Sequence, residues 1–260
     1  MVFIPSALGS DQLGLIEGAV EQSLAVPTQS TRRWYLDSGT TFHDDIGDDS
    51  TRERYLEIAR LARIADIVAS LWCTKELWYM GEQIFLKEGG FCRRTPWHQD
   101  TSYLPIQGEH LVSVWISLDP VPRQHALEFV RGSHQGTVYN GSAFDSRDDT
   151  APVYATNLAP RLPDIEAHRD SWDIVSWEVS PGDVIVFHLG VLHGGAGTEP
   201  GMRRRTASLR FIGPDAIYDG RRLEPLGMKT GNDDALESLY DRLAPGDLFR
   251  SPAFPKVWPK

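Results

Sequence analysis

Hydrophobic residues near the start of the chain are spaced as in an amphipathic helix. Over residues 10–24 they recur three or four positions apart on one stripe, formed by Leu13, Ile16, Val20 and Leu24. Ser10 or Asp11 stands where a helix cap is expected. The pattern predicts a first helix from about residue 10 to residue 24.

A second helical stretch has a broader apolar face. It follows Ser50 and Glu53, which have the spacing of a capping box. Its apolar positions are Tyr55, Leu56, Ile58, Leu61, Ile64, Ile67, Val68 and Leu71. We predict one helix here, packed along a sheet, and therefore a helical N-terminal part over about residues 1–75.

From residue 78 onward the pattern changes to short β-rich runs separated by glycine and proline. The runs cover residues 78–86, 97–103, 112–118, 127–130, 177–179, 183–188 and 205–212. Several short strands with turn residues between them are typical of a sandwich or barrel. Because they do not alternate with long helices, a parallel sheet is disfavoured. We predict a mainly β fold with flanking helices and an antiparallel core of the jelly-roll type.

A polar stretch at about residues 133–172 interrupts the strands without starting a second apolar core. Loops of this length are usually either functional lids or disordered, and we take this insertion as the candidate lid. A short helix is expected at residues 233–243. The whole chain, 1–260, is then one domain, with a jelly-roll core over about 78–213 and a C-terminal extension over 214–260.

Composition narrows the class of protein. Of the 260 residues, 41% are hydrophobic and 24% charged, which is ordinary for a globular protein and excludes general disorder. The net charge of −10 has the wrong sign for a nucleic-acid binder, and the apolar runs are too short to span a membrane. Cys73 and Cys92 form no disulfide framework, and the N-terminus lacks a signal peptide pattern. We expect a cytoplasmic protein with a small-molecule partner.

Two segments carry the candidate chemistry. His98 is followed two positions later by Asp100, and residues two apart on a strand point to the same face. The segment 181–195 contains a Pro-Gly-Asp turn, an apolar strand and His193, which is followed by two glycines. Glycines beside a ligand allow close backbone approach and leave room for a bound molecule.

Two histidines and one carboxylate occupy one side of an octahedral metal and leave three positions open, as in non-haem Fe(II) oxygenases. A closed structural zinc site needs a fourth ligand, and no cysteine is placed to supply it. Arg204 and Thr206 share a strand face further along the chain. Together they could hold a carboxylate, since a guanidinium binds one bidentately.

At this point the sequence resembles the phytanoyl-CoA dioxygenase family. The resemblance is carried by Trp-His-Gln-Asp at 97–100, Val-Trp-Ile-Ser-Leu-Asp at 114–119, Leu-Glu-Phe-Val-Arg-Gly-Ser-His at 127–134, the Pro-Gly-Asp strand, and His193 with Arg204. It covers about residues 78–213. It implies a double-stranded β-helix (jelly-roll, cupin-like) core, Fe(II), 2-oxoglutarate as co-substrate, and O2.

The resemblance also implies roles for individual residues. His98, Asp100 and His193 would be the iron ligands and the catalytic centre. Arg204 would pair with the distal carboxylate of 2-oxoglutarate, and Thr206 would assist. The remaining co-substrate candidates are Gln83, Lys87 and Trp115. The alternative for the first two is a solvated strand edge, and for the tryptophan a place in the core.

The remaining histidines near these motifs are expected to be structural. His134 belongs to the family's Gly-Ser-His turn, and His188 lies on the strand before His193. Relatives that halogenate lack the carboxylate at the position of Asp100, so its presence here favours hydroxylation or another oxidation over halogenation.

The resulting hypothesis is a dioxygenase that hydroxylates an unactivated C–H bond of a small metabolite, with release of succinate and CO2. Two alternatives stay open: a non-catalytic jelly-roll module that binds a small acid, and a zinc-dependent isomerase or hydrolase on the same scaffold. Serine-nucleophile chemistry has no support, because no Gly-x-Ser-x-Gly motif occurs. The sequence determines neither the primary substrate nor the oligomeric state.

Overall fold

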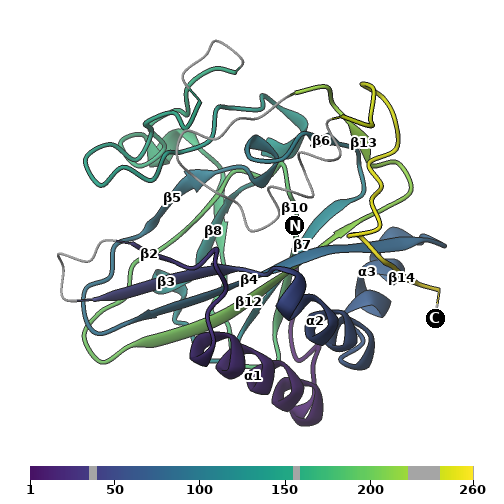
Figure 1. The fold of residues 1–260 in the computed structure, drawn as a ribbon. Helices are drawn as coiled ribbons and strands as arrows, with labels where there is room; N and C mark the ends of the chain where they lie inside the picture. The colour runs from purple at the N-terminus through teal and green to yellow at the C-terminus, as the bar shows by residue number, and fades with distance from the viewer. Residues whose placement is uncertain (35–39, 155–158, 222–240, 260) are drawn as a thin grey trace.

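In the computed structural model, residues 1–34, 40–154, 159–221 and 241–259 are described. Their largest element is an eight-stranded antiparallel sheet with the strand order β1-β10-β7-β12-β4-β3-β2, in which β14 also pairs with β4. The strands are β1 (Val2–Ile4), β2 (Arg32–Trp34), β3 (Thr41–Ile46), β4 (Leu77–Glu88), β7 (Leu111–Ser117), β10 (Val184–His188), β12 (Arg203–Ile212) and β14 (Lys256–Trp258). The pairs β1–β10, β10–β7, β7–β12 and β12–β4 join strands from distant parts of the chain, whereas β2, β3 and β4 are consecutive (Figure 1).

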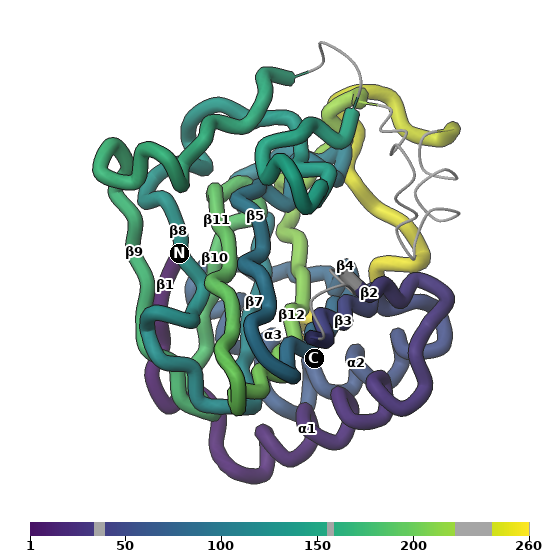
Figure 2. The backbone as a smooth tube through the Cα atoms, turned by 90° about the vertical axis from the view of Figure 1, so that its left-hand side faces the viewer, coloured from purple at the N-terminus to yellow at the C-terminus, as the bar shows by residue number. Residues whose placement is uncertain are grey.

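A second, smaller sheet lies beside the large one (Figure 2). Its strand order is β5-β11-β8-β9, and the strands are β5 (Thr95–His98), β8 (Leu127–Val130), β9 (Ile174–Ser176) and β11 (His193–Gly195). A further pair joins β6 (Ile106–Gln107) and β13 (Ile217–Tyr218). This arrangement of antiparallel strands in two sheets confirms the predicted jelly-roll core.

The central strands of the large sheet are covered on both faces. All seven residues of β7 are buried. Val114 and Ile116 belong to the core between sheet and helices, whereas Trp115 belongs to a cluster on the opposite face, as the two-residue repeat of a strand requires. Burial on both faces explains why β7 and β10 are nearly continuous apolar runs.

Three helices cover one face of the large sheet: α1 (Ser10–Ala25), α2 (Asp49–Leu61) and α3 (Ile64–Trp72) (Figure 1). Their buried residues join β4, β7 and β12 in the main hydrophobic core. The prediction of one long second helix was wrong, because Arg63 adopts a left-handed conformation (φ 60°) between α2 and α3. The break lets each half of the broad apolar face present its own stripe to the sheet.

Both predicted helix caps were also wrong by one or two positions. Gly9 precedes α1, and its amide donates a hydrogen bond to the Gln12 side chain (2.7 Å). Asp48 caps α2, where its carboxylate accepts a hydrogen bond from the amide of Ser50 (2.8 Å). Thr51, rather than a glutamate, completes that capping box by accepting a bond from the amide of Asp48 (3.1 Å).

Other boundaries differ from the sequence-based expectation. The run expected at 97–103 ends at His98 and continues as a 3-10 turn, Asp100–Ser102. The strand expected at 177–179 lies earlier, at β9. The strands β1, β2, β3 and β14 were not anticipated. The C-terminal helix expected at 233–243 falls mostly outside the described residues.

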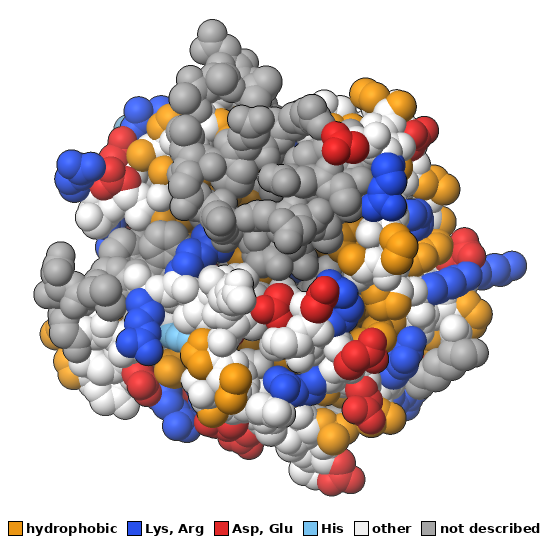
Figure 3. Space-filling model, viewed as in Figure 1, with side chains coloured by type: hydrophobic (Ala, Val, Ile, Leu, Met, Phe, Trp, Pro, Cys, Tyr) orange, Lys and Arg blue, Asp and Glu red, His pale blue; other side chains and the backbone are white. Residues whose placement is uncertain are grey.

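Two observations bear on the predicted partners. No helix in the described parts of the chain is long and apolar enough to cross a bilayer. On the face drawn in Figure 3, acidic and basic side chains are interspersed and form no broad field of one sign.

Candidate metal centre and active site

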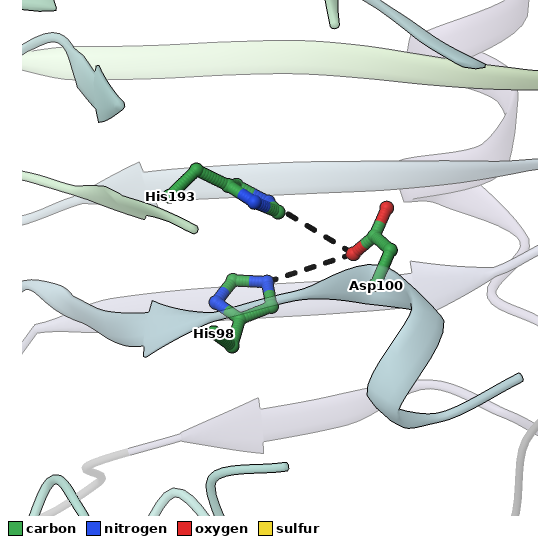
Figure 4. Close-up of side chains that lie close together, drawn as sticks. All are labelled: His98, Asp100 and His193. Carbon is green, nitrogen blue, oxygen red and sulfur yellow. Dashed lines mark ion pairs between the residues drawn. The ribbon is translucent and has the colours of Figure 1, made fainter. Parts of the chain in front are cut away.

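The two candidate histidines lie directly opposite each other on neighbouring strands of the small sheet. In the antiparallel pair β5–β11, the partner of His193 is His98. Asp100 begins the 3-10 turn that follows β5, so its side chain reaches back toward both imidazoles (Figure 4). Pairing of β5 with β11 therefore closes the distance between residues that lie far apart in the sequence.

The three side chains form one compact donor group. Oδ1 of Asp100 lies 3.6 Å from Nε2 of His98 and 3.9 Å from Nε2 of His193. One ligand atom from each residue lies within 4.8 Å of the others. Within the described part of the chain, this is the one group of three or more such residues close enough to hold a metal ion.

Backbone carbonyls set the tautomer of both imidazoles. Nδ1 of His98 lies 2.8 Å from the carbonyl oxygen of Pro96, and Nδ1 of His193 lies 2.9 Å from that of Val191. A carbonyl oxygen only accepts, so each Nδ1 carries the proton and donates it. Each Nε2 is left with a lone pair directed at the Asp100 side, which is the form that a metal requires.

Electrostatics favour the same protonation states. Burial, with a smaller contribution from His193, lowers the pKa of His98 to about 4. Burial also lowers the pKa of His193. For Asp100, burial by itself raises the pKa, but Arg210 and the two imidazoles outweigh it and hold the pKa below its ordinary value. Two neutral imidazoles and one carboxylate are therefore available at neutral pH.

The group opens into a cavity between the two sheets. The triad and the glycines after His193 line it from the small-sheet side. From the large sheet, every second residue of β12 faces the cavity over a strand length of about 20 Å. These residues are Arg204, Thr206, Ser208 and Arg210. Aromatic side chains supply much of the rest of the lining.

One part of the cavity is cationic. Arg204 on β12 and Lys87 on β4 are register partners and are only 5% and 1% exposed. Lys87 donates hydrogen bonds to the carbonyl of Arg93 and to Oγ1 of Thr95, both at 3.0 Å, and Arg204 donates to the carbonyl of His125. Among the described residues, neither cation has a carboxylate within ion-pair distance.

Burial without a counter-ion is costly for these two groups. It lowers the pKa of Arg204 to about 10 and, together with the nearby Arg204, lowers the pKa of Lys87 well below its ordinary value. A cavity that holds two such cations beside a metal-type donor group is suited to a small anion that also reaches the metal.

The family model described as "Phytanoyl-CoA dioxygenase (PhyH)" matches residues 19–206 of the chain. The protein belongs to the phytanoyl-CoA dioxygenase family. It is therefore an Fe(II)- and 2-oxoglutarate-dependent dioxygenase family enzyme, and the His-Asp-His group has the composition that such a metal centre needs. The resemblance found in the sequence is confirmed.

A curated relative is the probable alpha-ketoglutarate-dependent hypophosphite dioxygenase of Stutzerimonas stutzeri. It is 24% identical over 145 residues, which are 53% of this chain and 48% of the relative. The chain thus matches about half the length of that relative.

Solved structures share the fold across most of the chain. The alpha-ketoglutarate-dependent epimerase SnoN from nogalamycin biosynthesis has a TM-score of 0.68 and 20% identity, covering 98% of this chain and 90% of its own. The carbocyclase SnoK from the same biosynthesis has a TM-score of 0.66 and 21% identity over 98% and 91%. EctD from S. alaskensis has a TM-score of 0.57 and 20% identity over 88% and 76%.

In this phytanoyl-CoA dioxygenase family member, the other predicted site residues also line the cavity. Thr206 lies beside Arg204 on the same face of β12, and Trp115 faces the cavity from β7. Gln83 and Lys87 face it from β4. The solvated strand edge considered for these last two does not occur, because β3 pairs with β4 along this stretch.

Sequence reasoning did not identify several residues that shape the site. Gln99 is 1% exposed, and its side chain ties its own turn to two other segments: Nε2 donates to the carbonyls of Gly190 (2.8 Å) and Thr137 (3.2 Å), and Oε1 accepts from the amide of Tyr139 (2.9 Å). It thereby fixes the turn that carries Asp100. The available signal was the position of this glutamine between His98 and Asp100 in the Trp-His-Gln-Asp motif.

The predicted insertion contributes directly to the cavity. Phe144, which has a left-handed backbone conformation (φ 54°), lines it with its ring centroid 5.7 Å from that of His98. The segment is anchored nearby by Tyr103, whose hydroxyl donates to the carbonyl of Ser142 (2.9 Å). Polar composition gave no indication of this inward-facing ring.

His188 is held by backbone groups on both ring nitrogens. Nε2 donates to the carbonyl of Gly108 (3.0 Å), and Nδ1 accepts from the amide of Gly190 (2.9 Å). The ring of His134 lies 5.2 Å away, outside the donor group. These contacts agree with structural roles.

Proposed function

We propose that this chain acts as a single oxygenase domain that uses Fe(II), 2-oxoglutarate and O2 to hydroxylate an unactivated C–H bond of a small metabolite. The observation that carries the proposal is the combination, in one cavity, of a two-histidine, one-carboxylate group with two buried cations. Neither feature alone indicates an oxygenase. Together they provide a metal position and a counter-charge for a dicarboxylate that chelates the metal through its other end.

His98 and His193 would bind the metal through Nε2, and Asp100 through one carboxylate oxygen. The donor set suits Fe(II) with three positions open, and no fourth protein ligand is present among the described residues to close it as a structural zinc site. When bound, iron and 2-oxoglutarate supply the oxidising chemistry: O2 delivers one oxygen atom to the substrate C–H bond and one to succinate, with release of CO2.

Arg204 and Lys87 would hold the distal carboxylate of 2-oxoglutarate. The bound anion would supply the missing counter-charge and favour the ammonium form of Lys87, so part of the cost of burying both groups would be recovered on binding. Thr206 would assist with its hydroxyl, and Trp115 would form a wall of the co-substrate pocket. A Cβ added to Gly195 would lie 3.2 Å from Cδ2 of Leu127 and 3.5 Å from Nη2 of Arg204, so glycine keeps this end of the cavity open.

The substrate would occupy the part of the cavity near the triad. There, the rings of Phe144 and Phe187 lie 5.7 Å and 4.7 Å from the imidazoles of His98 and His193. Such a lining favours a small, mostly apolar metabolite and excludes solvent from the reacting atoms. The insertion at about 133–172 would act as a lid, with Phe144 as its contact to the substrate.

Hydroxylation is the outcome that the residues favour. The carboxylate of Asp100 takes the position that a halide needs, which disfavours halogenation. Proteins of similar fold include an epimerase and a carbocyclase, so the scaffold accommodates other oxidative outcomes. A non-catalytic or zinc-dependent module that binds a small acid is the alternative.

The test is coupled turnover. Protein prepared without oxygen is loaded with Fe(II) or Zn(II), and succinate is measured with 2-oxoglutarate, O2 and a panel of small metabolites. We expect succinate to form with Fe(II) and not with Zn(II). The His98→Ala and His193→Ala variants should form no succinate. The His168→Ala variant, which changes an exposed histidine, should form as much succinate as the wild type. Succinate formation that survives His98→Ala, or that Zn(II) supports equally, would contradict the proposal.

A further inference from the structure

Arg210 contacts the carboxylate of the triad from the large sheet. It lies on β12, faces the cavity, and its side chain is 16% exposed. Its Nε donates a hydrogen bond to Oδ2 of Asp100 (3.1 Å). Oδ1, the other oxygen, faces Nε2 of His98 and His193. The two oxygens of one carboxylate therefore have separate surroundings, one cationic and one facing the candidate metal position.

The guanidinium is itself held in place. Its Nη2 donates to Oε1 of Gln83 (2.6 Å), and Nε2 of Gln83 donates to Oδ1 of Asp44 (2.6 Å). The chain of hydrogen bonds thus runs from the triad through β12 and β4 to β3. Because the fork of arginine is planar, fixing Nη2 also fixes the direction of Nε toward Asp100.

This arrangement bears on how Asp100 can bind a metal. A free carboxylate can chelate with both oxygens and then occupies two of the six positions of an octahedral ion. A carboxylate whose second oxygen accepts a charge-assisted hydrogen bond favours binding through the first oxygen alone. Only the second mode leaves three positions, two of which 2-oxoglutarate takes and one of which is left for O2.

We propose that Arg210 is a positioning residue that holds Asp100 as a one-oxygen ligand and thereby keeps the 2-oxoglutarate positions open. The inference rests on the proposed function, since it presupposes a metal at the triad. The inference predicts opposite effects of losing Arg210 on the affinity for Fe(II) and on the affinity for 2-oxoglutarate. Loss of Arg210 removes a cation close to the metal and frees the second oxygen, so metal affinity should be kept or increase. The affinity for 2-oxoglutarate should fall, because a chelating Asp100 competes for one of its positions.

The experiment uses the full chain under anaerobic conditions. Fe(II) affinity is measured by competition with a chromophoric chelator, and 2-oxoglutarate affinity by the visible charge-transfer absorption of the ferrous chelate. The variants are Arg210→Met, which has no donor, and Arg210→Lys, which keeps the charge without the fork. Arg203→Met is the matched control, since Arg203 is an exposed arginine of the same strand.

We expect both Arg210 variants to bind Fe(II) at least as tightly as the wild type and to bind 2-oxoglutarate at least about tenfold more weakly, which corresponds to about 1.4 kcal/mol of binding free energy. Arg203→Met should match the wild type in both. If Arg210→Met does not fold, Arg210→Lys decides by the same comparison. Unchanged 2-oxoglutarate affinity, or equal losses of both affinities, would overturn the inference. A wild-type protein that binds no Fe(II) would instead remove the proposed function itself.

Discussion

Replacing Arg204 by methionine should stabilise the ligand-free protein while removing its response to 2-oxoglutarate. The guanidinium is buried without a carboxylate partner among the described residues, and burial lowers its pKa from 12.5 to about 10. A cation with a lowered pKa in the folded state destabilises that state wherever it is charged, here at all pH values below about 10. At 1.36 kcal/mol per pKa unit, the cost is about 3 kcal/mol.

The hydrogen bond from Arg204 to the carbonyl of His125 offsets part of that cost. Its loss should cost about 1 kcal/mol, so the net gain of Arg204→Met is about 1–2 kcal/mol. At about 2–4 °C per kcal/mol for a protein of this size, the melting temperature should then rise by about 2–8 °C. With ligand bound, the wild type should instead be the more stable protein. At a hundred times its dissociation constant, 2-oxoglutarate stabilises the wild type by about 2.7 kcal/mol and the Arg204→Met variant hardly at all.

The assay is thermal unfolding of both proteins with Fe(II), without oxygen, in the absence and presence of 2-oxoglutarate. Arg205→Met is the control. Arg205 is the next residue on β12 and is equally buried, but it is paired with Asp119 and Glu17. Its loss should lower the stability of both states and leave the 2-oxoglutarate shift intact. The reasoning fails if Arg204→Met keeps the full ligand shift, or if it destabilises the ligand-free protein.

Three further outcomes can be checked. Between pH 7.5 and 5.5, protonation of His98 should not weaken Fe(II) binding, because the pKa of His98 is about 4 and the imidazole stays neutral over this range. A histidine with a pKa near 6.5 would instead lower the apparent Fe(II) affinity roughly tenfold, and a titration that shows such a fall would contradict the prediction. Phe144→Ala should raise the KM for the primary substrate and increase succinate release uncoupled from product, with 2-oxoglutarate affinity unchanged; coupled turnover at the wild-type KM would exclude the lid contact. Asp48→Ala should lower the free energy of unfolding by about 1 kcal/mol in urea denaturation, and Ser50→Ala by clearly less; equal effects would contradict the assigned cap.

The chemistry-bearing residues could be identified from the sequence because they lie in short motifs with distinctive residue types. The local structure predicted for one of these residues, Asp100, was nevertheless wrong. Asp100 was expected on the same strand face as His98, but β5 ends at the histidine and the carboxylate approaches from a 3-10 turn. The residues meet as predicted because a tight turn and a strand both keep positions two apart close together.

The cationic part of the cavity depends on a strand that hydrophobic pattern cannot reveal. The sequence of β3, Thr-Phe-His-Asp-Asp-Ile, is polar, and some of its buried polar groups form hydrogen bonds, such as the one that Asp45 accepts from the Thr28 amide (3.2 Å). Pairing of β3 with β4 converts what looked like a solvated edge at Lys87 into an interior position. Long-range pairing decides such burial, and no local signal encodes it.

The most direct test is anomalous X-ray diffraction at the iron edge from crystals grown anaerobically with Fe(II) and 2-oxoglutarate. The account predicts one iron peak bound by Nε2 of His98, Nε2 of His193 and a single oxygen of Asp100, with the distal carboxylate of 2-oxoglutarate against Arg204. An iron peak away from these three side chains, or a co-substrate carboxylate that does not reach Arg204, would contradict it.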